Sequence, residues 1–103
     1  MKLNLNERFT VLGILPKESN FATLKIVREL QGVLAPSEAE FKEFEVKQEE
    51  GQIRWNKKGL EEREIKIGEK AADVIKEALK ALDKEKKMLP QHVPLWEKFV
   101  DDK

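Results

Sequence analysis

Hydrophobic residues recur at helical intervals near both ends of the chain and alternate with polar residues in the middle. In the N-terminal third the apolar positions follow one another at spacings of three and four, which is typical of one helix face: Phe9, Leu12, Leu15, and then Phe21, Leu24, Val27, Leu30 and Leu34. Asn6 is a candidate N-cap, and Ser37 with Glu40 matches a capping box. The pattern predicts helices over residues 6–15, 20–34 and 37–43.

The spacing of apolar residues becomes two from residue 44 onward, which indicates β-strands. Phe44 and Val46 alternate with charged residues, and the pair Glu50-Gly51 that follows suits a tight turn. Alternation resumes at Ile53 and again in a short stretch that ends at Ile67. We therefore expect three strands that form an antiparallel meander: 44–49, 52–56 and 62–67.

Helical spacing returns after Gly68, where alanines and leucines form an apolar stripe and charged residues cover the other face. This stripe predicts a long helix over residues 69–87. Pro94 suits the first turn of a short final helix over residues 94–101. The expected order α-α-α-β-β-β-α-α describes an α+β fold in a single domain, residues 1–103.

The composition narrows the class of protein. The chain has 103 residues, a size that fits one domain, and its 20 basic and 20 acidic residues give a formal net charge of zero. No apolar stretch approaches the ~20 residues of a membrane span, and the N-terminus shows no signal-peptide pattern. Cysteine is absent, which fits a reducing compartment. We expect a protein of the cytoplasm without a membrane partner.

Candidate catalytic chemistry is sparse. The sequence has one histidine, His92, and two serines, Ser19 and Ser37, which are better explained as helix caps. The five glycines are dispersed, so no phosphate-binding loop is expected, and no zinc motif is present. We therefore expect a protein that is not an enzyme, with no catalytic residue, no metal and no cofactor.

The predicted hairpin carries the one cluster in which an indole and several cations lie close together in sequence. A guanidinium and an indole can hold a base or a phosphate by ion pairing and stacking. The alternative is that Trp55 points into the core while the cations are ordinary surface. The candidate site for an anionic, nucleotide-like ligand consists of Arg54, Trp55, Lys57 and Lys58.

Three helices followed by a hairpin also suggest a winged helix, in which the third helix reads DNA. The segment 37–43 would then be the reading helix, but it carries three glutamates and no Arg, Asn or Gln. Phosphates would repel these carboxylates. A winged-helix DNA-binding regulator is therefore the alternative function, and we expect no tight binding to nucleic acid.

The final helix is short but rich in apolar residues. It either folds back onto its own core or packs on a second subunit, because burial of these side chains would be enough to hold a dimer. The candidate interface of a homo-oligomer consists of Leu95, Trp96, Phe99 and Val100.

Several short segments, spread over most of the chain, have a recognisable style. They include Asn20-Phe21-Ala22-Thr23-Leu24-Lys25, Ile67-Gly68-Glu69-Lys70-Ala71 and Trp96-Glu97-Lys98-Phe99-Val100. On these segments the chain resembles uncharacterised phage and mobile-element proteins, which implies a bacterial host cell and assigns no residue a role. The expected function is a non-enzymatic binding protein that acts on a host protein or sequesters a small anionic ligand.

Overall fold

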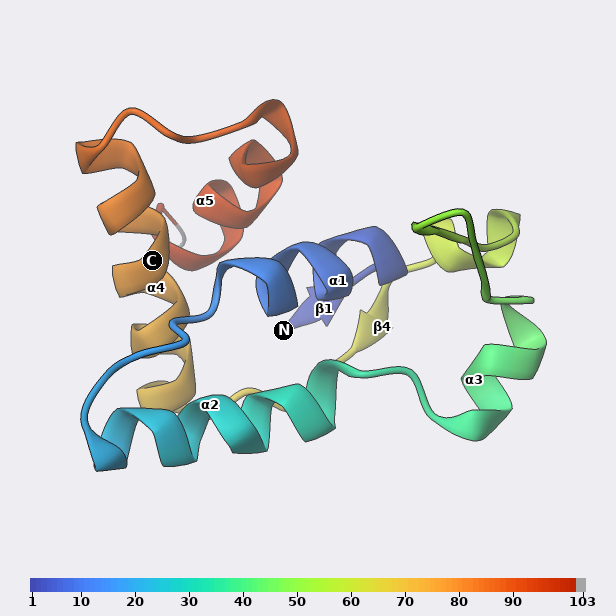
Figure 1. Ribbon diagram of the computed structural model, residues 1–103, viewed down its shortest axis with the longest axis horizontal. Coiled ribbons are helices and arrows are strands. Elements are labelled where there is room, and N and C mark those ends of the chain that lie inside the picture. The colour runs from blue at the N-terminus through green and yellow to red at the C-terminus, as the bar shows by residue number, and fades with distance from the viewer. Residues whose placement is uncertain (102–103) are drawn as a thin grey trace.

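The computed structural model describes residues 1–101, which form an α+β fold, as expected from the sequence (Figure 1). The helices are α1 (Leu5–Ile14), α2 (Phe21–Leu34), α3 (Glu38–Glu43), α4 (Glu69–Lys84) and α5 (Val93–Phe99). The strands are β1 (Lys2–Leu3), β2 (Lys47–Glu49), β3 (Gln52–Arg54) and β4 (Arg63–Glu64). Two short 3₁₀ helices complete the chain, η1 (Lys57–Leu60) and η2 (Pro90–His92).

Side-chain caps set where the N-terminal helices begin. The side-chain oxygen of Asn4 accepts a hydrogen bond from the backbone N–H of Glu7 (2.8 Å). In return, the Glu7 carboxylate accepts one from the backbone N–H of Asn4 (3.0 Å). Asn4 is therefore the cap of α1, and the expectation that Asn6 caps it is wrong, since Asn6 lies within the helix. The capping box of α3 is confirmed: the Ser37 hydroxyl accepts from the Glu40 amide at 3.2 Å.

The predicted hairpin is confirmed in a shorter form. Strands β2 and β3 pair antiparallel, with Gln48 opposite Ile53. The turn residues Glu50 (φ 47°) and Gly51 (φ 77°) are both left-handed, as a two-residue hairpin turn requires. All six residues of the two strands are exposed.

The three-stranded meander is wrong. Strand β4 pairs with β1 at the N-terminus, where Lys2 lies opposite Glu64, and not with the hairpin. The exposed hairpin offers no buried face to a third strand. Beside β1, in contrast, Leu3 and Ile65 are both buried, and the Ile65 amide donates to the Met1 carbonyl at 2.8 Å.

The last two helices are shorter than predicted. α4 ends at Lys84, because the chain turns sharply at Lys86, which has a positive φ of 57°. η2 then leads into α5, and the Leu89 amide donates to Nδ1 of the buried His92 at 2.9 Å.

The core lies among α1, α2, α4 and α5. Figure 1 shows α1 between α2 and α5, with α4 running across the ends of these helices and the hairpin and α3 at the opposite end of the molecule. The buried core residues are Leu3, Val11, Leu15, Val27, Leu30, Leu34, Ile65, Ile75, Leu79, Leu95 and Phe99.

Candidate functional site

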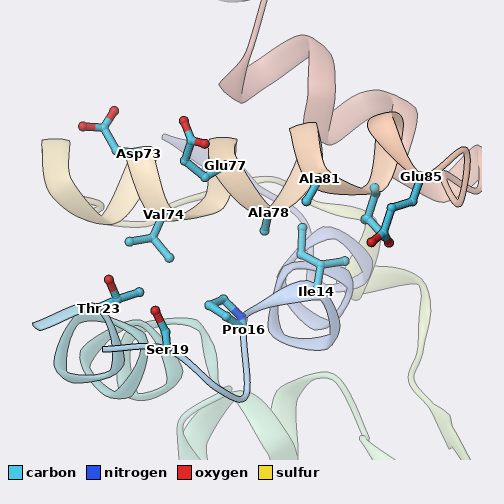
Figure 2. Close-up of a pocket in the computed structure, with 11 residues that line it drawn as sticks. Ile14, Pro16, Ser19, Thr23, Asp73, Val74, Glu77, Ala78, Ala81 and Glu85 are labelled. Carbon is cyan, nitrogen blue, oxygen red and sulfur yellow. The ribbon is translucent and has the colours of Figure 1, made fainter. Parts of the chain in front are cut away.

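A groove of about 530 Å³ lies between α4 and the N-terminal end of α2. Its floor is apolar: Figure 2 shows Val74 and Ala78 of α4 pointing toward Pro16, with Ile14 beside them. Ser19 and Thr23 form the opposite wall, and their hydroxyls are the uncharged polar groups of the lining. The groove can therefore accept an apolar side chain and offer hydrogen bonds at one edge.

The rim of the groove is acidic. Asp73, Glu77 and Glu85 line it, and Figure 2 shows the carboxylates of Asp73 and Glu77 on the side of α4 that faces away from Pro16. Within residues 1–101, no Lys or Arg lines the groove. An anion would be repelled here, whereas an apolar group next to a cation would be complementary to both floor and rim.

Local sequence explains why a groove forms at this place. α1 ends at Ile14 with Leu15 as its C-cap, and the segment from Pro16 to the Asn20 cap takes the chain around to α2. On the facing side of α4 the floor positions are small, Ala78 and Ala81, so the two walls stay apart. Sequence reasoning missed this site. The alanines of α4 could have indicated it, because small residues on one face of a helix are found where a groove is left open as well as where another element packs closely.

The structure places the predicted ligand site at the far end of the molecule. Arg54 ends β3 opposite Lys47, and Lys57 and Lys58 begin η1; all four cations are exposed. Because these cations belong to one short segment, the structure keeps them at one end of the fold, near the hairpin.

The indole of that site is already in contact with its own chain. The Trp55 ring is half-buried and packs on Phe9, with ring centroids 5.4 Å apart. On Gly59 a Cβ would lie 2.3 Å from Cδ1 of Trp55, so that residue must be glycine for the indole to fit. Trp55 therefore acts mainly as a packing residue between η1 and α1, and the cations remain as the accessible part of the predicted site.

The predicted oligomer interface divides into two parts. Leu95 is 0% exposed and Phe99 5% exposed, and both belong to the core of their own chain. Trp96 and Val100 are only partly buried beside that core, and the Trp96 indole N–H donates to the Asp101 carboxylate at 3.2 Å. The surfaces of Leu95 and Phe99 are therefore already covered by their own chain.

The buried and half-buried charges form ion pairs within the fold. The Arg8 guanidinium donates two hydrogen bonds to Glu40, at 2.8 and 3.1 Å, and Arg63 pairs with Glu43 at 2.7 Å. The hydrogen bond from Arg8 lowers the pKa of Glu40 to about 2. A carboxylate held ionised in this way stabilises the fold and is unsuited to proton transfer near neutral pH.

A second ion-pair cluster ties α5 to the N-terminus. The Lys98 ammonium donates to Glu7 and to Glu62, and also to the Lys2 carbonyl. Burial lowers the pKa of Lys98, but its hydrogen bonds to Glu62 and Glu7 outweigh that effect and raise it.

Over residues 1–101 no group of three or more His, Asp or Glu side chains is placed to hold a metal ion. In the same range no helix combines the length and the apolar character needed to cross a membrane.

Comparison of the chain with protein-family models, curated proteins and solved structures finds no match.

Proposed function

We propose that this chain is a non-enzymatic binding protein of phage type, which acts in the cytoplasm of a bacterial host cell by holding a segment of a host protein in the groove between α2 and α4. The observation that carries this proposal is the combination of an apolar floor with three rim carboxylates and no lining cation in the described chain. The phage context is supported by the resemblance of the sequence segments given above.

The chemistry of the groove defines the partner segment. Val74, Ala78 and Ile14 favour a side chain such as Phe, Leu or Met, and the rim favours a neighbouring Lys or Arg. A segment with these features binds by burying the apolar side chain, which contributes about 1.5–3 kcal/mol when fully buried, while the charges guide its approach.

A displayed peptide library tests this proposal. We expect selection on the immobilised protein to enrich peptides that combine an apolar side chain with Lys or Arg within one helical turn. Ala81 lies exposed in the lining, so Ala81→Arg fills the groove and repels cations; this variant should capture none of the enriched peptides.

The matched control is Ala39→Arg, which adds the same charge at an exposed position of α3. It should retain full capture. Enrichment of acidic peptides, or equal capture by wild type and Ala81→Arg, would contradict the proposal.

A further inference from the structure

The N-terminal end of α2 exposes an aromatic ring that its own chain does not cover. Phe21, the first residue of the helix, is 83% exposed, the highest fraction among the exposed large hydrophobic residues. Leu24 lies one turn further on the same side of the helix and is 36% exposed. Together they form a small apolar surface at the end of α2 that lies near α4 in Figure 1.

Positive charge surrounds this apolar surface. Lys17 and Arg28 line a depression together with Leu24, and Lys25 follows Phe21 by four residues, which places it on the same helix face. The segment 17–28 contains three cations and one carboxylate, Glu18, a net charge of +2. It therefore has the chemistry that the groove requires of its occupant: an exposed apolar side chain between cations.

We propose that the groove of one copy of this chain holds Phe21 and Leu24 of a second copy, with Lys17, Lys25 and Arg28 of that copy facing the acidic rim. This inference rests on the proposed function, because it uses the same groove, and it identifies a competing occupant in the free protein. Three rim carboxylates meet three cations at the contact, so the electrostatic potentials are complementary.

The position of Phe21 makes the contact intermolecular. Thr23 lines the groove of its own chain. Phe21 precedes Thr23 by two residues, which is a rotation of about 200° around the helix axis, so the two side chains lie on nearly opposite sides of α2. Phe21 therefore points away from its own groove. The donor surface and the acceptor groove are different surfaces, so the contact is head-to-tail and extends to further copies unless it closes into a ring.

Two variants separate the donor from the acceptor. Phe21→Ser removes the inserted ring and leaves the groove open, whereas Ala81→Arg blocks the groove and leaves Phe21 in place. By light scattering we expect the mass of the wild type to rise with concentration, and each variant alone to be monomeric, with self-association at least about tenfold weaker. An equimolar mixture of the two variants should form a 1:1 dimer, because it contains one intact donor and one intact groove.

Val33→Ser is the matched control, since Val33 is an exposed apolar residue of α2 outside the segment 17–28. It should associate like the wild type. A wild type that is monomeric at high micromolar concentration, or a mixture that stays monomeric, would overturn the inference. Peptide capture by Phe21→Ser, whose groove is free, tests the proposed function separately: capture by this variant together with a monomeric wild type would refute only self-association.

Discussion

Arg8 joins three elements through one side chain that is 2% exposed. Its Nε donates to the Leu34 carbonyl at 2.9 Å and Nη2 to the Ala35 carbonyl at 3.2 Å, so it satisfies acceptors that the end of α2 leaves free. The same guanidinium pairs with Glu40 of α3. A buried arginine is stable here because its donors find carbonyls and a carboxylate in place of water.

This pairing predicts acid sensitivity. The hydrogen bond from Arg8 lowers the pKa of Glu40 from 4.5 to about 2 in the folded state. Because the folded pKa is the lower one, the stabilisation is present above pH 4.5 and is lost as the pH falls through 2. We expect the free energy of unfolding to fall by about 3 kcal/mol from this group across that window. Urea titrations followed by circular dichroism at several pH values measure it.

Glu40→Gln tests the assignment of this acid sensitivity to Glu40. The variant should be less stable at neutral pH, since it leaves Arg8 without its counter-charge, and its stability should fall less steeply with acid. Glu38→Gln, at an exposed position of the same helix, should keep the wild-type pH profile. Equal pH profiles for Glu40→Gln and the wild type would contradict the assignment.

At the scale of elements, the sequence predicts a helix or hairpin correctly where its apolar residues repeat at a regular spacing or where a characteristic turn pair is present. The spacing from Phe21 to Leu34 predicts α2 to within one residue at its start, and Glu50-Gly51 predicts the hairpin turn. Strand β1 has only two residues, which is too short for an alternation of apolar and polar positions to be recognised. It pairs with β4 through residues that lie about 60 positions away in the sequence, as Leu3 does with Arg63. The groove was missed for a similar reason, because it lies between elements that are distant in sequence.

Helix α5 provides the second prediction. Phe99 is buried in the core of its own chain, whereas Val93 at the start of the same helix is half exposed. Phe99→Ala should lower the free energy of unfolding by about 3–5 kcal/mol, and Val93→Ala should change it by less than about 0.5 kcal/mol. Thermal and urea unfolding of both variants measure the difference.

Deletion of residues 94–103 extends this test to the whole helix. The truncated chain should lose cooperative unfolding or aggregate, because it uncovers the core beneath Leu95 and Phe99. A truncated chain that stays folded and only decreases in subunit number would show instead that α5 packs on a neighbouring subunit.

At the scale of the molecule, the two candidate sites lie at opposite ends and differ in the charges that line them, although each end contains both cations and carboxylates and the formal net charge is zero. Figure 1 places the hairpin and η1, with their exposed cations, at one end and α4, whose carboxylates line the groove, at the other. The difference between the two candidate sites is therefore local: exposed cations next to the hairpin, and carboxylates in the lining of the groove. An anionic ligand suits the hairpin end, and a basic segment suits the groove.

The anionic ligand yields the last prediction. Three exposed cations attract phosphate, but the Trp55 ring packs on Phe9 and is not free to stack. We therefore expect ATP to bind at this end with a millimolar Kd that weakens as salt is added, since the interaction is electrostatic. The Arg54→Ala/Lys57→Ala/Lys58→Ala variant should lose this binding and keep its Tm, measured by NMR titration and thermal unfolding.

A charge-matched variant shows whether ATP binding depends on the position of the cations or only on the total charge of the protein. Replacing Lys66, Lys70 and Lys80 with alanine removes the same charge at exposed positions outside the hairpin and η1. ATP binding should survive in this variant, because local cations outweigh distant ones once salt screens the charges beyond about 10 Å. Unchanged affinity in the Arg54/Lys57/Lys58 variant would rule the site out. Micromolar binding that is lost in Trp55→Ala while the fold survives would show that the indole leaves Phe9 to stack on the base.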